Sequence, residues 1–173
     1  PIDDEMFGKI YMAKYKNNGT MRAIKVIKKD KMKKHNMDAQ VKREIEILPQ
    51  LNHPNILQFY GFFEDETRWF LVFEFCKKGN LFKQLRKAGR FDEKRAAHCV
   101  KSITEALQYC HGLNCIHRDL KPENIMVDDN DQIKLTGFEW AVRTNKKRNS
   151  FCGTLDYLCP EINQGKYYDG AVD

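Results

Sequence analysis

Alternating polar and apolar positions indicate β-strands through most of the first half of the chain. Residues 9–15 and 21–27 carry this period-two pattern on either side of a turn signal at residues 17–19, so we expect a hairpin. Residues 57–63 and 69–75 are aromatic, strand-like runs on either side of a second turn. The first half therefore predicts a sheet of antiparallel strands.

Helical spacing appears at two places. Between residues 36 and 50, three apolar positions recur at helical intervals and a proline ends the pattern: Val41, Ile45, Leu48 and Pro49. Asp92 is a good N-cap for a longer helix in the second half. The predicted buried face of that helix is Ala96, Val100, Ile103, Leu107 and Cys110. The pattern predicts an α+β fold with strands first and helices later.

Composition restricts the class of protein. The 173 residues are 42% hydrophobic and 31% charged, enough for one globular unit with a core. No apolar run is long enough to span a membrane, and the six cysteines lack C-x-x-C spacing, so we expect reduced thiols in the cytoplasm or nucleus. The net charge of +6 comes with basic runs that lack interleaved aromatic residues. Nucleic acid is therefore an unlikely partner, although an acidic one stays open.

Residues 115–124, C-I-H-R-D-L-K-P-E-N, carry the most specific chemistry in the chain. They resemble the catalytic loop of protein kinases, H-R-D-L-x-x-x-N, in which an Asp receives the substrate hydroxyl proton and an Asn holds Mg²⁺. Ala23-Ile24-Lys25 resembles the V-A-I-K strand, whose Lys binds the ATP phosphates and pairs with a helix Glu, here Glu44. Residues 152–161 resemble the end of a kinase activation loop.

The resemblance is specific to the Aurora branch of serine/threonine kinases and covers the whole chain. It rests on R-E-I-E-I at 43–47, H-P-N-I-L at 53–57 and C-G-T-L-D-Y-L at 152–158. It implies a two-lobed fold, with residues 1–76 as a complete small lobe of antiparallel sheet plus one helix. Residues 77–173 would be an incomplete helical large lobe that ends after the activation loop.

The same resemblance implies roles for individual residues, with ATP and Mg²⁺ as cofactors and a protein substrate or regulatory protein as partner. Asp119 would orient the hydroxyl, Lys121 would neutralise the transferred phosphoryl group, and Asn124 would hold the metal. Ser150 would be a phosphorylation site whose phosphate binds Arg118. The expected adenine-binding residues are Ile10, Ala23, Glu74, Cys76 and Met126.

Four positions depart from the family pattern. Gly137 stands where D-F-G has its metal-binding Asp, and Glu139 stands where it has Gly. Asp3 and Glu5 replace two glycines of the phosphate-binding loop when Phe7-Gly8 is aligned with it. Glycine offers no oxygen to Mg²⁺. We therefore expect an impaired kinase, with two alternatives open: a non-catalytic pseudokinase that acts as a binding module, or rescue of the metal site by Glu139.

Overall fold

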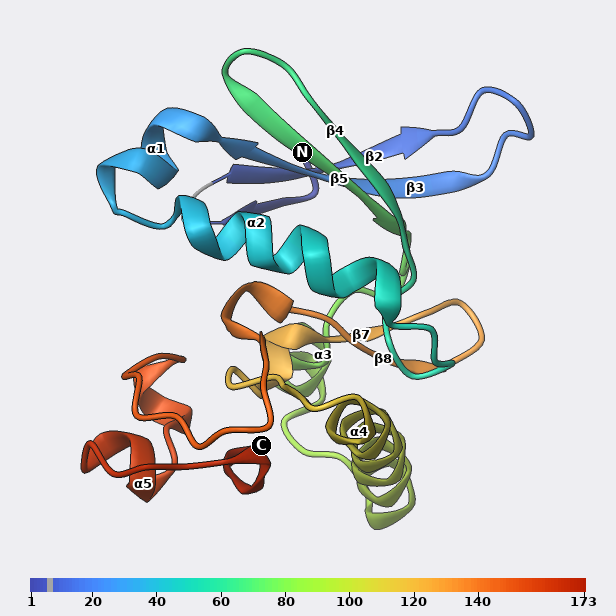
Figure 1. Cartoon of the computed structure of the whole chain (residues 1–173). Coiled ribbons are helices and arrows are strands. Elements are labelled where there is room, and N and C mark those ends of the chain that lie inside the picture. Colours follow the sequence, from blue (N-terminus) through green and yellow to red (C-terminus); the bar gives the residue numbers. More distant parts are fainter. Residues whose placement is uncertain (6–7) are drawn as a thin grey trace.

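A five-stranded antiparallel sheet forms the upper part of the computed structural model, which describes residues 1–5 and 8–173 (Figure 1). The strand order is β1-β2-β3-β5-β4. The bounds are Asp3–Glu5 for β1, Gly8–Lys14 for β2, Met21–Lys28 for β3, Phe59–Glu64 for β4 and Arg68–Glu74 for β5. The predicted antiparallel strands are confirmed. Phe7 and the side chains of Asp3 and Glu5 lie outside what the structure describes.

The hairpin of β2 and β3 is present as predicted, with Gly8 opposite Ile27 and Lys14 opposite Met21. The turn follows from Gly19, whose φ of 73° suits glycine. Gly8 is required for a different reason, because a Cβ at this position would overlap the Val26 carbonyl of β3. Gly8, at the end of the expected phosphate-binding loop, is thus tied closely to β3, the strand that carries Lys25.

Helix α2 (Asp38–Ile47) lies below the sheet in Figure 1, and α1 (Lys29–Lys34) follows directly from β3 beside the left end of the sheet. The sequence predicted α2 but not α1, so the expectation of one helix is corrected. The sequence of α1 is lysine-rich and gives no apolar period; Met32 is its buried residue, at 3% exposure. On α2, Val41 and Glu44 face inward.

The lower part of the molecule is mainly helical. It contains α3 (Leu81–Ala88), α4 (Glu93–Gly112) and α5 (Pro160–Asn163), with two short strand pairs between them. The first pair joins β6 (Cys115–Ile116) to β9 (Val142–Arg143), and the second joins β7 (Ile125–Val127) to β8 (Ile133–Leu135). Within the described ranges, no helix is long and apolar enough to cross a bilayer.

Helix α4 begins after Asp92, whose side chain accepts the Arg95 N–H at 2.7 Å, as the N-cap prediction required. The predicted buried face is right at Cys110 and wrong at Val100. Val100 is 63% exposed, whereas the buried positions are Cys99, Ser102, Ala106 and Cys110. Small side chains let this face approach the core closely, and Ile103 and Leu107 lie at its border, partly buried.

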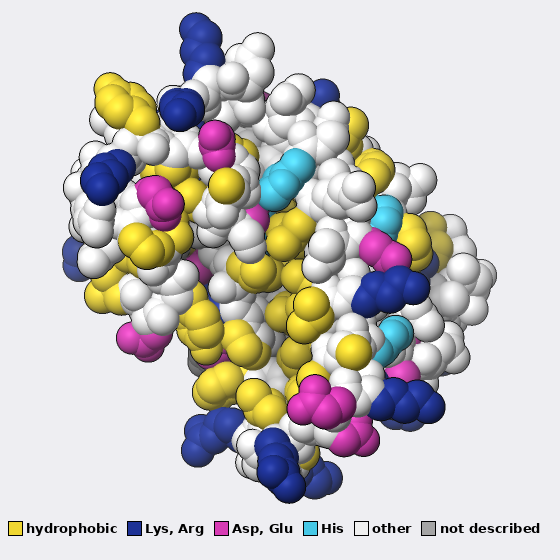
Figure 2. Space-filling view, turned by 90° about the horizontal axis from the view of Figure 1, so that it is seen from below, with side chains coloured by type: hydrophobic (Ala, Val, Ile, Leu, Met, Phe, Trp, Pro, Cys, Tyr) yellow, Lys and Arg dark blue, Asp and Glu magenta, His cyan; other side chains and the backbone are white. Residues whose placement is uncertain are grey.

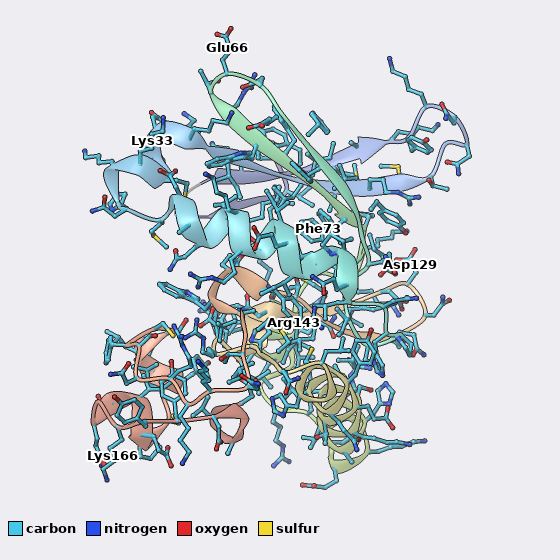
Figure 3. The ribbon with its side chains drawn as sticks, viewed as in Figure 1. Lys33, Glu66, Phe73, Asp129, Arg143 and Lys166 are labelled. Carbon is cyan, nitrogen blue, oxygen red and sulfur yellow. The ribbon has the colours of Figure 1, made fainter. Side chains whose placement is uncertain are left out.

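One hydrophobic core runs from the sheet into the lower part. Leu71 of β5, Leu135 of β8 and Cys110 of α4 are all fully buried in it. Phe73, at the end of β5, lies in the junction between the sheet and the elements below (Figure 3). The face seen from below shows a hollowed band of hydrophobic side chains between charged flanks (Figure 2). The two parts therefore share a continuous interior at the level of the candidate site.

Candidate active site

The loop between β6 and β7 is held by backbone bonds to a distant carboxylate. The Asp173 side chain accepts the N–H groups of His117 and Arg118, each at 2.7 Å. Arg118 has a φ of 68°, a left-handed conformation that is uncommon for a residue with a side chain. The buried His117 ring contacts Thr136 through its Nε2, 2.8 Å from the carbonyl oxygen. These bonds place Asp119, 6% exposed, at the centre of the site.

Three side chains surround the Asp119 carboxylate. The Thr154 hydroxyl donates to Oδ1 at 2.6 Å, and the Lys121 ammonium lies 2.9 Å from Oδ2. The Asn124 amide nitrogen donates to Oδ2 at 2.9 Å and to the Asp119 carbonyl at 2.8 Å. Both oxygens are acceptors, so the nitrogen of Asn124 must be the atom that faces them. The sequence placed Asp119, Lys121 and Asn124 together, and the structure brings them together.

Gly137 lies directly against Asn124. Its φ is 81°, and a Cβ built at this position would lie closer than 3.0 Å to the Asn124 amide group. Real Cβ atoms essentially never come so close. The Asn124 side chain therefore occupies the space that a side chain at position 137 would need.

Lys25 of β3 lies among carboxylates from two other elements. Its ammonium is 3.6 Å from Glu44 Oε1 on α2, as the sequence predicted for this pair. It also forms a short ion pair with Glu139, which the sequence did not predict. Lys25 is 8% exposed, and a buried ammonium needs such compensation. The second carboxylate comes from the residue that stands in place of the D-F-G glycine.

The ammonium of Lys25 favours the charged form of the Glu139 side chain. Burial of its acidic end acts to raise the pKa, but the nearby Lys25 ammonium outweighs this and holds the pKa below its ordinary value. One third of the side chain is still exposed. In this conformation Glu139 is directed to Lys25, not to Asn124, so the structure gives no support to metal rescue by Glu139.

The expected adenine residues lie around the junction below the sheet. Ile10 of β2 is opposite Lys25, and Ala23 of β3 is opposite Phe73 of β5. Cys76 is 5% exposed, and burial raises the pKa of its thiol to about 12. The remaining two are Glu74 at the end of β5, 3.3 Å from the Lys134 ammonium, and Met126 on β7. Their role in adenine binding stays a prediction.

Arg118 is already occupied where the sequence expected a phosphate to bind. Its Nε donates to the Trp140 carbonyl at 2.8 Å, and its Nη1 donates to the Tyr168 hydroxyl at 3.0 Å. Ser150 reaches this cluster through its carbonyl, which accepts from Tyr168 at 2.9 Å. A phosphate on Ser150 would have to exchange with the Tyr168 hydroxyl, and the proposed pairing with Arg118 stays a prediction.

Sequence reasoning missed the contacts made by Thr154, Tyr168, Asp173 and Glu139. Each contact joins the site to a residue far away in the chain. A signal existed for Thr154, since it lies within the activation-loop match, and none existed for the tyrosine. A pocket of about 120 Å³ opens beside Asp119, with Thr154 and Asp173 in its wall. A hydroxyl group entering there would come close to the carboxylate.

The fold and the catalytic-loop geometry define a protein kinase domain. The protein kinase domain family model matches residues 6–173, and the chain belongs to this family. Members of the family use ATP with Mg²⁺ and act on protein substrates.

The relatives specify the branch, because the chain is similar to Aurora kinases along its entire length. It is 44% identical to Aurora kinase B of Xenopus tropicalis over 174 aligned positions, covering 100% of the chain and 48% of the relative. Identity to an Aurora kinase of Dictyostelium discoideum is 46%, covering 96% of the chain and 44% of the relative. Identity to the serine/threonine-protein kinase Aurora-1 of Arabidopsis thaliana is 42%, covering 100% and 59%. The domain is Aurora-like, and the chain spans about half the length of these relatives.

Proposed function

We propose that this domain is an Aurora-like serine/threonine kinase in which transfer of the ATP γ-phosphoryl group to protein hydroxyls is impaired. The parts that handle the hydroxyl are assembled: Asp119 is buried and hydrogen-bonded, and Lys121 lies beside it. The positions expected to bind the metal and the phosphates are altered at Gly137 and Glu139. The proposed setting is the cytoplasm or nucleus, with a protein substrate or regulatory protein as partner.

The observation that carries the proposal is the contact between Gly137 and Asn124. Mg²⁺ needs hard oxygen ligands in near-octahedral geometry. Gly137 supplies no side chain, and Asn124, whose amide nitrogen is bound to Asp119, offers a single neutral oxygen in place of a carboxylate. The residues in this arrangement do not fit the metal, so no step of the proposed reaction is assigned to it.

A second candidate function, that of a pseudokinase binding module, is favoured by the ion pair between Lys25 and Glu139. ATP phosphates would have to displace the Glu139 carboxylate to reach the Lys25 ammonium. A triphosphate would then meet added negative charge rather than a free cation. Under this alternative the fold would engage a partner protein through its surface without turnover.

Thermal unfolding with nucleotide tests the proposal. ATP is expected to raise the melting temperature slightly, and Mg²⁺ is expected to add little, because the metal position lacks its carboxylate. A shift of several degrees that appears only when Mg²⁺ accompanies ATP would contradict the impaired metal site. Phosphate transfer to a basic serine peptide, compared between the wild type and Asp119→Asn, then separates the two functions. Slow phosphate transfer by the wild type that Asp119→Asn abolishes supports the impaired kinase. An equal background signal from the wild type and the variant supports the pseudokinase binding module.

A further inference from the structure

Tyr168 lies at the centre of a buried hydrogen-bond cluster that the kinase assignment does not explain. The residue is 3% exposed, five positions from the end of the described chain. Its hydroxyl contacts Arg118 Nη1 at 3.0 Å, the Ser150 carbonyl at 2.9 Å and the Cys152 sulfur at 3.8 Å. The cluster joins the catalytic loop to residues 150–152 of the activation segment.

The direction of each hydrogen bond follows from the groups involved. A guanidinium can only donate, so the Tyr168 oxygen accepts from Arg118. The hydroxyl hydrogen is then available for the Ser150 carbonyl, which can only accept. Burial raises the pKa of Tyr168 above its ordinary value despite the nearby Arg118, so the phenol keeps this hydrogen at neutral pH.

The backbone fixes the same segment independently of the side chain of residue 150. The Arg148 N–H donates to the Tyr168 carbonyl at 2.8 Å, and the Tyr168 N–H donates to the Arg148 carbonyl at 2.7 Å. This antiparallel bridge holds residue 148 beside residue 168. The Arg118 guanidinium also binds the Trp140 carbonyl, near the start of the segment. Arg118 and Tyr168 together therefore join both ends of the loop at residues 140–150.

We propose that Tyr168 is a positioning residue that holds the activation segment on Arg118 in the unmodified chain. The Tyr168 hydroxyl accepts a hydrogen bond from the Arg118 guanidinium. It thereby takes the place that a phosphate on Ser150 would occupy in a phosphorylated chain. Arg118 directly precedes Asp119, so the same bonds fix the loop that carries the catalytic carboxylate. The activation segment is then ordered by Tyr168 and does not need a phosphate on Ser150.

Limited proteolysis of the unphosphorylated chain tests this inference. Trypsin is expected to cut after the exposed Lys146 and Lys147 about tenfold faster in Tyr168→Phe, because cleavage follows the population of the open loop and two buried hydrogen bonds are lost. The matched control is Tyr167→Phe, which removes a hydroxyl from a neighbouring ring that is 67% exposed. Equal cleavage of the two variants would overturn the proposal.

A double-mutant cycle shows whether Tyr168 acts through Arg118. In an Arg118→Lys background, Tyr168→Phe is expected to raise the cleavage rate only about threefold, because the bond to the guanidinium is already lost and the bond to the Ser150 carbonyl remains to be lost. An undiminished effect in that background would overturn the proposed route. If Tyr168→Phe does not fold, amide hydrogen exchange of unphosphorylated Arg118→Lys, compared with the wild type, decides. Faster exchange at Arg148 and Tyr168 in the variant supports the proposal, and equal exchange overturns it.

Discussion

Replacing Glu139 by Gln should increase the affinity for ATP, because it removes the carboxylate that competes for Lys25. The substitution keeps the shape of the side chain and deletes its charge. Lys25 would still have Glu44, 3.6 Å away, so the buried ammonium would not be left uncompensated. The fold should therefore tolerate the change, and the effect on nucleotide binding can be measured directly.

The expected magnitude has two parts. Breaking a partly exposed ion pair costs about 1 kcal/mol. A displaced carboxylate about 6 Å from a phosphate charge is repelled by about 3 kcal/mol at an effective dielectric constant of about 20. Part of this repulsion is relieved when the Glu139 side chain turns towards solvent. Together these costs amount to about 1.5–3 kcal/mol, so Glu139→Gln should lower the Kd for ATP about 10- to 100-fold.

Calorimetric titration with ATP in the presence of a chelator gives this Kd without any contribution from metal. The control is Glu46→Gln, which removes the same charge from an exposed position of α2, away from Lys25. A Kd for Glu139→Gln within twofold of both the wild type and this control would refute the competition between carboxylate and phosphate.

The pKa of Glu139 adds a test of the same ion pair. Its pKa is lower in the folded chain than the ordinary 4.5, so the charged form stabilises the fold above that pH. The stabilisation is lost as the pH falls through the folded-state pKa. The gap in unfolding free energy between wild type and Glu139→Gln should therefore be constant near neutrality and close below about pH 4.5. A gap that widens on acidification would show that the pair does not exist.

Three further outcomes are expected. Gly137→Asp combined with Glu139→Gly should make the thermal shift by ATP depend on Mg²⁺, with the Asn124 side chain moving aside to admit the new carboxylate, while either change alone should not. Asp92→Ala should lower the free energy of unfolding by about 1 kcal/mol in a denaturant titration through loss of the helix cap; a change near zero would mean that the cap bond is not formed in solution. Phosphorylation of Ser150 by a basic-directed kinase should slow trypsin cleavage after Lys146 and Lys147 further, because Arg118 would exchange Tyr168 for the phosphate. Protection that survives Arg118→Ala would exclude that exchange.

Local patterns in the sequence predicted the sheet well. The hairpin of β2 and β3 follows from alternation and a turn glycine at position 19, which are properties of neighbouring residues. Helix α4 was placed correctly by its Asp92 cap, yet its inward face was not. Val100 has the stronger hydrophobic signal, whereas Ala106 packs closer because it is small.

Contacts between residues far apart in the chain could not be predicted in this way. The pair of Lys25 and Glu139 joins positions 114 residues apart, and nothing near either residue specifies the other. The catalytic-loop match predicted that Asp119 and Asn124 lie together, and they do, with the Asn124 amide nitrogen 2.9 Å from Asp119 Oδ2, while their roles stay predictions. The match could not show that the Asn124 amide lies in the space that a side chain at position 137 would need.

The bonds from Asp173 to the backbone of the catalytic loop also have a consequence for folding kinetics. The carboxylate reaches back 55 residues to the Arg118 N–H, so the loop cannot take its final form until that late part of the chain has docked. Such long-range closures form slowly, whereas the β2–β3 hairpin needs only near neighbours. During synthesis, the sheet that carries Lys25 can therefore form while Asp119 is still unplaced. The Asp119 carboxylate would therefore reach its final position only after Asp173 has docked.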